Sequence, residues 1–263
     1  MQPVANQARH QSTSPTIPSE EPAGCFCLGS RTVHQPSREV AHRTKREYYP
    51  DNLSIQPNRH KWGRRMEWLI VACVDFLEKE GLDERNIFAV SAVDDLVRNM
   101  TVEEGEELAK NTDPNVAAGV IKAQIRHADE ALVGKECLRT YIELQQAREG
   151  DGSPGDGLRS YEESHLARTV DDTKRISGAR RAYVLARIMR LLGRVSANEE
   201  VSRMNAHCLA KCVAPSMLHW DPNSGFALLM LGKITAFVMT MIEDARVFDE
   251  NLCQKIDELA QEC

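Results

Sequence analysis

The spacing of the apolar residues from Met66 onward is the feature that most limits how this chain can fold. Large apolar side chains recur there at intervals of three and four, as they do on one face of an α-helix. The first such stripe consists of Met66, Leu69, Ile70, Cys73, Val74 and Leu77. No segment alternates with a period of two for long enough to indicate a strand. The pattern predicts an all-α fold, a single helical bundle of about eight or nine helices.

Capping signals and further apolar stripes place the individual helices. Gly81 is typical of a helix end, and Asp113 followed by Pro114 is typical of a helix start. Ser91 and Thr101 are expected to cap two short helices between them. The later helices are expected at about residues 135–148, 178–195, 198–213, 224–244 and 248–259.

The chain divides into a tail and one domain. Residues 1–45 are rich in Gln, Ser, Pro and Thr and hold few large apolar residues, so we expect a disordered basic tail. Residues 46–263 are expected to form the helical domain. Within it, the acidic, glycine-rich stretch that follows residue 148 predicts a mobile loop at about residues 149–174.

Charge is distributed unevenly along the chain. Residues 1–65 contain ten basic and five acidic residues, whereas the remainder contains 23 basic and 34 acidic residues. The acidic body argues against a nucleic-acid partner, which usually requires a basic face. The basic N-terminal segment is either a peripheral contact to an anionic membrane or simply a solvated tail.

No cofactor or metal site is expected from the sequence. No His is spaced from Cys as in a zinc site, and no glycine-rich nucleotide loop is recognisable. The first eleven residues contain no apolar block, so no secretory signal is expected. Several of the eight Cys fall in apolar helical patterns and are predicted to be buried thiols, which favours a reducing, cytoplasmic location.

Three segments, in the same order and spacing, resemble the RhoGAP domain, the helical module that stimulates GTP hydrolysis by Rho-family GTPases. In the first segment, Ile87, Phe88 and Ser91 match the family pattern E-G-I-F-R-x-S-G. The Arg of that pattern is the catalytic arginine finger of the family. Ala89 occupies its position here, and Ala92 occupies that of the second Gly.

The second segment, residues 117–126, resembles the family helix V-A-x-x-L-K-x-x-L-R. Lys122 and Arg126 fall on its Lys and Arg, four residues apart and therefore on one helical face. The resemblance implies that this pair supports the finger loop and contacts the GTPase. We expect both side chains beside the Ala89 loop, with Val120, Ile121 and Ile125 turned inward. The two prolines that follow this motif in the family are absent here.

The third segment, residues 202–218, resembles the family pattern N-K-M-x-x-x-N-L-A-x-x-x-x-P-x-L-L. Ser202 and Cys208 stand where the family has two Asn residues that serve the GTPase interface. The resemblance makes both positions candidate GTPase-binding residues. The matching positions are mostly apolar and build the fold, whereas the departures fall on the polar ones.

The resemblance implies a regulator or scaffold of small-GTPase signalling that binds a Rho-family GTPase with little or no activating activity. Two alternatives stay open. In the first, the domain is an active GTPase activator that uses a displaced arginine, for which Arg85 on the same loop or Arg126 is the candidate. In the second, it is an adaptor that binds a protein other than a GTPase.

Overall fold

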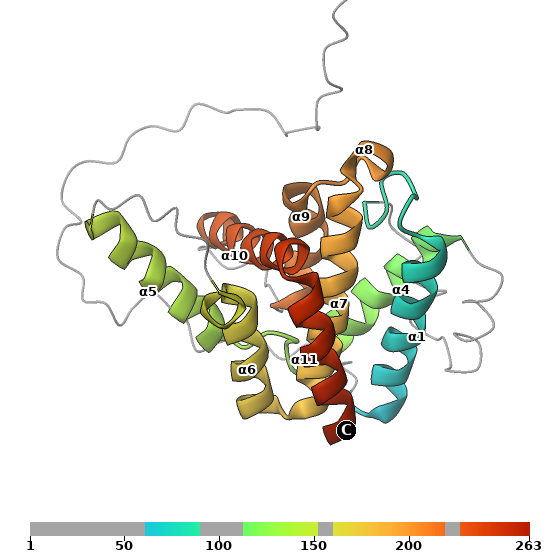
Figure 1. Cartoon of the computed structure of the whole chain (residues 1–263), viewed down its shortest axis with the longest axis horizontal. Helices are drawn as coiled ribbons and strands as arrows, with labels where there is room; N and C mark the ends of the chain where they lie inside the picture. Colours follow the sequence, from blue (N-terminus) through green and yellow to red (C-terminus); the bar gives the residue numbers. More distant parts are fainter. Residues whose placement is uncertain (1–60, 90–112, 152–159, 219–226) are drawn as a thin grey trace, which may run out of the picture. The chain divides into compact units, whose positions relative to one another are not determined.

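The computed structural model describes residues 61–89, 113–151, 160–218 and 227–263, which all belong to one compact unit, Asp51–Cys263. Every regular element within these ranges is helical, and no strand occurs there. The expectation of an all-α fold is confirmed. In the numbering of Figure 1, the helices are α1 (Arg64–Glu80), α4 (Pro114–His127), α5 (Lys135–Asp151), η1 (Tyr161–Glu163), α6 (His165–Ser177), α7 (Ala179–Ala197), α8 (Glu199–Ser202), α9 (Ala206–Met217), α10 (Ala227–Val247) and α11 (Asp249–Glu262).

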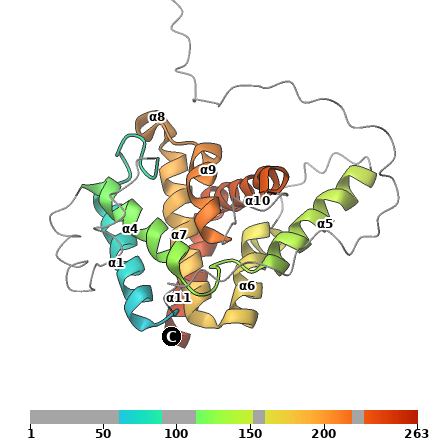
Figure 2. The same cartoon turned by 180° about the vertical axis from the view of Figure 1, so that it is seen from behind.

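Helix α7 lies at the centre of the described bundle. It packs against α1, α6, α9, α10 and α11, and both views place α1 and α4 on one side of it and α5 and α6 on the other (Figures 1 and 2). Its apolar residues are buried on several faces, including Leu185, Ile188 and Leu192, which are 0–1% exposed. A helix that is apolar nearly all round belongs in the interior of a bundle.

A glycine allows α7 and α10 to cross closely. A Cβ atom at Gly193 would lie 2.9 Å from the backbone carbonyl carbon of Ala245 and 2.9 Å from the amide nitrogen of Arg246, both in α10. Real Cβ atoms do not approach other atoms so closely, because interiors are already packed at crystal-like density. Glycine at position 193 therefore sets the separation of the two most extensively packed helices.

Two expectations about the middle of the chain were wrong. The loop predicted at about residues 149–174 is helical from His165 onward, in α6. Ser164 caps this helix by accepting a hydrogen bond from the amide of Ala167. Its buried face includes Leu166 and Val170, but small polar residues and a histidine complete it, so the apolar stripe is too sparse to recognise in the sequence. The acidic, glycine-rich residues 152–159 lie outside the described ranges.

The helix predicted at about residues 198–213 is two helices, α8 and α9. Arg203 has a left-handed backbone conformation with φ of 60°, and its amide bonds the carbonyl of Glu199, which ends α8. The Asn205 side chain then accepts a hydrogen bond from the amide of Cys208 and begins α9. The expected tail at residues 1–45 and the expected caps at Ser91 and Thr101 lie outside the described residues.

Among the described helices, none combines the length and the apolar character needed to cross a membrane. Within the same ranges, no group of three or more His, Cys, Asp and Glu side chains is arranged to hold a metal ion.

Gly193→Ala is expected to lower the free energy of unfolding, because the new methyl group meets the backbone of α10. Overpacking costs about 1–3 kcal/mol, which exceeds the gain of about 0.5–1 kcal/mol for alanine over glycine inside a helix. Urea denaturation measures the difference. Gly232→Ala in α10 is the matched control: a Cβ there has no atom within 4 Å, so stability should rise. Equal stabilisation by both substitutions would contradict the close crossing.

Candidate functional site

Residues 81–89 form a loop at the start of the segment between α1 and α4. The last residue of this loop, Ala89, is exposed. The amide of Gly81 bonds the carbonyl of Leu77 and ends α1, as the sequence indicates. A side chain at position 81 would not fit, because a Cβ atom would lie 2.6 Å from Cδ2 of Leu77. Glycine is therefore required where the loop leaves α1.

Two residues of this loop adopt left-handed backbone conformations. Asn86 has φ of 58° and Phe88 has φ of 67°. Such values are uncommon for residues other than glycine and persist only where the surroundings enforce them. Ile87, which lies between these two residues, and Phe88 itself are 0% and 1% exposed. Ala89, in contrast, is exposed, and its amide bonds the carbonyl of Asn86 to close the turn.

Hydrogen bonds from two other parts of the domain hold the bends in place. The Lys122 ammonium group, on α4, donates to the carbonyl oxygen of Phe88 at 2.5 Å. The amide of Asn86 donates to the carbonyl oxygen of Ser202, at the end of α8, at 2.9 Å. Phe88, directly before Ala89, is thus held by α4. Asn86, where the turn begins, is held by α8.

Helix α4 supplies the first of these contacts. The Asp113 side chain accepts a hydrogen bond from the amide of Asn115 and Pro114 occupies the first turn, as predicted. Val120, Ile121 and Ile125 are buried, as expected. Burial lowers the pKa of Lys122, an effect that the nearby Cys212 thiol opposes and Arg126 reinforces. The lysine gives up hydration to reach the loop, so its hydrogen bond to Phe88 offsets part of that cost.

Arg126 lies one turn further along α4, on the same side as Lys122, and is exposed. Its guanidinium group contacts the Ser216 hydroxyl, on α9, at 3.4 Å, which is long for a hydrogen bond. Arg85 is also exposed and lies on the loop itself. Of the positions that the resemblance singles out, Lys122 contacts the loop directly, Arg85 and Ala89 are exposed on it, and Arg126 contacts α9.

Ser202 requires a correction. Its side chain is 0% exposed, donates to the carbonyl of Val195 and accepts from the amide of Met204. It cannot reach a partner protein, so its contribution to the site is the backbone carbonyl that holds Asn86. Cys208, the other candidate GTPase-binding position on α9, is half-buried and packs against the core.

Two asparagines that hold the loop are absent from the sequence-based list of site residues. The Asn115 amide group donates to the Glu84 carboxylate at 3.2 Å. The Asn198 amide group, directly after α7, donates to the carbonyl of Leu82 at 3.3 Å and to the Asp83 carboxylate at 2.6 Å. Asn is common where a helix ends, but that signal does not reveal a partner more than a hundred residues away in the sequence.

The RhoGAP domain family model matches residues 68–222, which include the loop, α4 and α9. This chain belongs to the RhoGAP domain family. Mouse Rho GTPase-activating protein 22 is 27% identical over 192 residues, which cover 70% of this chain and 26% of that protein. Human Bargin is 23% identical over 193 residues, which cover 72% of this chain and 26% of that protein. The RhoGAP chain thus spans about a quarter of the length of these relatives.

Solved structures agree on the fold. The crystal structure of human Rho GTPase activating protein 15 has a TM-score of 0.51 and 15% identity, covering 68% of this chain and 82% of that one. The BH domain of Graf, the GTPase regulator associated with focal adhesion kinase, has a TM-score of 0.52 and 15% identity. It covers 75% of this chain and 98% of that one. At this identity the likeness concerns the arrangement of helices.

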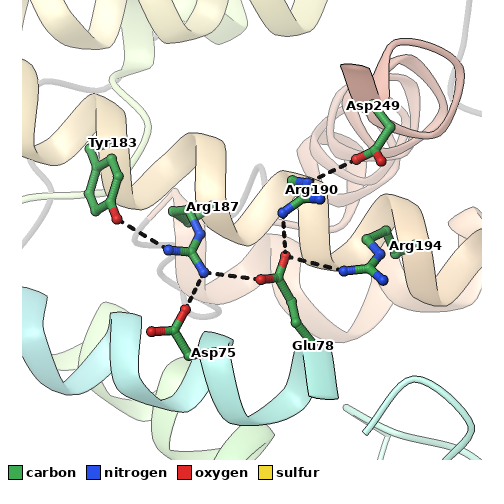
Figure 3. A network of polar contacts seen from close by, with 7 residues as sticks. All are labelled: Asp75, Glu78, Tyr183, Arg187, Arg190, Arg194 and Asp249. Atoms are coloured by element: carbon green, nitrogen blue, oxygen red, sulfur yellow. Dashed lines mark hydrogen bonds and ion pairs between the residues drawn. The ribbon is translucent and has the colours of Figure 1, made fainter. Parts of the chain in front are cut away.

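The RhoGAP loop is anchored at its start by an ionic network (Figure 3). Glu78, in the last turn of α1, accepts hydrogen bonds from Arg187 at 3.1 Å and from Arg190 at 3.2 Å, and Arg194 lies 3.8 Å away. Arg187 also pairs with Asp75, and Arg190 pairs with Asp249 of α11 at 3.0 Å. Arg187 is largely buried in this network, with its side chain 12% exposed.

The oppositely charged groups in this network stabilise one another. Burial disfavours the Arg187 cation, but its hydrogen bonds to Asp75 and Tyr183 and the charge of Glu78 outweigh burial and raise its pKa. The Glu78 side chain is only 12% exposed. Because each ion is partly removed from water, loss of one partner leaves the others without compensation. The network therefore fixes the end of α1 from which the loop departs.

Glu78→Ala is expected to lower the free energy of unfolding by about 3–5 kcal/mol, the usual cost of breaking a buried ion pair. Thermal or urea denaturation measures it. Asp172→Ala is the matched control, because Asp172 pairs with the exposed Arg175 within α6 and should contribute less than about 1 kcal/mol. If both changes had similar small effects, the network would not be an anchor for α1.

Lys122→Met is expected to loosen the loop without unfolding the domain, because the carbonyl of Phe88 loses a charge-assisted partner worth about 1.5–3 kcal/mol. Hydrogen exchange at the amides of Asn86 and Ala89, both of which are bonded within the site, should accelerate by about tenfold or more. Arg126→Met removes a neighbouring cation that does not hold the loop and should leave these amides protected. Unchanged exchange in Lys122→Met would show that the loop does not depend on the lysine.

Proposed function

We propose that this RhoGAP domain binds a small GTPase of the Rho family through loop 81–89 and the adjoining faces of α4 and α9, with little or no stimulation of GTP hydrolysis. The observation that carries the proposal is the loop itself. Lys122 and Ser202 hold its bends, and residue 89 projects into solvent. The residue in that position is Ala.

The chemistry of phosphoryl transfer explains why an alanine at position 89 would limit catalysis. Negative charge in the transition state is stabilised by a guanidinium group supplied in trans, which adds a bidentate donor to a positive charge. Such a group accounts for roughly 10³–10⁵ in rate. A methyl side chain at position 89 supplies neither charge nor donors. The remaining contribution of such a domain is to bind the GTPase and to compete with other regulators for it.

The exposed side chains around the loop suit a binding role. Arg126 is exposed beside Lys122, and Cys208 on α9 is partly exposed. Ser202 faces inward and serves through its backbone. Binding would therefore depend on Arg126 more than on the substituted Asn positions.

A second candidate function is a GTPase activator that uses Arg85. The observation in its favour is that Arg85 is exposed on the same loop, four residues before Ala89. Single-turnover GTP hydrolysis by a panel of Rho-family GTPases tests it, with Arg85→Ala as the variant. Stimulated turnover that Arg85→Ala abolishes would select this function. Binding of the GTP-loaded form without turnover supports the main proposal, and binding to neither nucleotide form favours an adaptor for another protein.

Ala89→Arg is expected to confer stimulation of GTP hydrolysis on whichever GTPase binds the wild-type domain. The loop already orients position 89, so a restored guanidinium should raise the single-turnover rate by about 10–10³, a part of the full effect of a finger. Ala89→Lys is the matched control, because lysine adds the charge without the planar donor fork and should stimulate less.

The outcome is informative in either direction because binding is measured in parallel. If Ala89→Arg binds the GTP-loaded GTPase and the rate stays at the intrinsic level, Ala89 is not at the finger position. In that case the adaptor function replaces the main proposal. Equal stimulation by Arg and Lys would indicate a general charge effect rather than a finger.

A further inference from the structure

Helices α4 and α9 both begin at the loop and pack against each other. At the start of α4, the Asn115 side chain bonds Glu84 of the loop. Just before α9, the carbonyl of Ser202 bonds Asn86 of the loop. The two helices therefore extend away from the loop in the same direction, and residues at equal distances from it can face each other.

The contact between Arg126 and Ser216 fixes which residues of α4 and α9 face each other. The guanidinium nitrogen and the hydroxyl oxygen lie 3.4 Å apart. Residues four apart lie on the same side of a helix, one turn from each other. One turn nearer to the loop, Lys122 on α4 therefore faces Cys212 on α9. Burial lowers the pKa of Lys122 and Cys212 opposes this shift, which agrees with the placement.

Cys212 combines partial exposure with neighbouring cations. Its side chain is half-buried and packs against the core, while the Lys122 ammonium group faces it and the exposed Arg126 lies one turn further along α4. The thiolate is the reactive form of cysteine, and reactive cysteines occur where cations stabilise the thiolate and solvent reaches it. Cys73 and Cys137, in contrast, are buried, and burial raises the pKa of Cys73 to about 12 and that of Cys137 to about 11.

From this geometry we propose that Cys212 is a modification site for small disulfides that carry carboxylate groups. The thiol gives its proton to water, and its sulfur attacks one sulfur of the disulfide. A new sulfur–sulfur bond forms, and the other half of the reagent leaves as a thiolate. The protein thiol is oxidised and the reagent is reduced. Lys122 and Arg126 attract the carboxylates, which favours anionic over cationic disulfides.

The mixed disulfide acts on the loop through Lys122. In the unmodified chain, the Lys122 ammonium group donates to the carbonyl oxygen of Phe88. A carboxylate attached at Cys212 competes for this ammonium group, and a hydrogen bond between two ions is stronger than one to a neutral carbonyl. Modification therefore releases Phe88 and loosens loop 81–89. Its effect on GTPase binding rests on the proposed function, whereas the reaction and the loosening of the loop do not.

Reaction rates of individual cysteines in the whole chain test the first step. The chain is treated with dithiobis(nitrobenzoate), a disulfide with two carboxylates, or with cystamine, a cationic disulfide, and peptide mass spectrometry follows each cysteine. Cys212 should react with the anionic reagent about tenfold faster than Cys208, which is also half-buried on α9. The preference for the anionic reagent over the cationic one should also be greater at Cys212 than at Cys208.

A pair of lysine variants tests the part played by Lys122. Lys122→Met should slow the reaction of Cys212 by about tenfold, because the thiolate loses the cation that faces it. Lys211→Met is the matched control: Lys211 is exposed and directly precedes Cys212, but consecutive residues do not face the same side of a helix. Because its charge is also screened by salt, the rate should change less than about twofold. Circular dichroism confirms that both variants are folded.

Hydrogen exchange at the amides of Asn86 and Ala89 tests the second step. After treatment with dithiobis(nitrobenzoate), these amides should exchange about tenfold faster or more, and a reducing agent should restore their protection. The Cys212→Ser chain, treated in the same way, should keep both amides protected. This comparison separates the effect of Cys212 from modification of the other cysteines.

Three results would overturn the proposal. The first is a Cys212 that reacts with the anionic reagent no faster than Cys208. The second is an unchanged rate at Cys212 in the Lys122→Met chain. The third is a chain modified at Cys212 whose loop amides stay protected. Binding of GTP-loaded Rho-family GTPases is measured separately: a chain that binds none contradicts the proposed function, while the rates and the hydrogen exchange still decide whether Cys212 controls the loop.

Discussion

The burial of α7 is the constraint on which the rest of the described structure depends. Most of its faces contact other helices, and glycine at position 193 lets α10 approach it at backbone distance. Because the interior is packed closely, the positions of the surrounding helices follow from the shape of this one. Its few charged residues are paired rather than solvated, with Arg187 and Arg190 joined to Glu78 of α1.

The same helix governs the loop at both of its attachments. Through Glu78 it fixes the end of α1, where the loop begins. Directly after α7, Asn198 bonds the first residues of the loop and the carbonyl of Ser202 bonds its bend. The orientation of residue 89 is thus a consequence of core packing. Because Ala89 is exposed and held through backbone bonds, a substitution of its side chain should cost the fold little.

The sequence was sufficient for the fold class and for most helices, because most long helices carry an apolar stripe, and α1 and α4 also carry a recognisable cap. It failed for α6, where Thr169, Thr173 and His165 complete the buried face. It also failed at Arg203, where a left-handed residue other than glycine separates α8 from α9 without a recognisable signal. Both failures concern positions where tertiary packing outweighs local preference.

The sequence by itself determined the all-helical bundle and the family, because periodicity and motif spacing are local properties of the chain. Only the tertiary structure decided which atoms hold the loop. Ser202 acts through its backbone carbonyl, and Asn198, which the sequence did not single out, bonds the carbonyl of Leu82. The resemblance implied that Lys122 supports the loop, and the structure shows that it does so by bonding the carbonyl of Phe88. These bonds join segments that are distant in the sequence, so they exist only after the helices pack, and no local pattern encodes them.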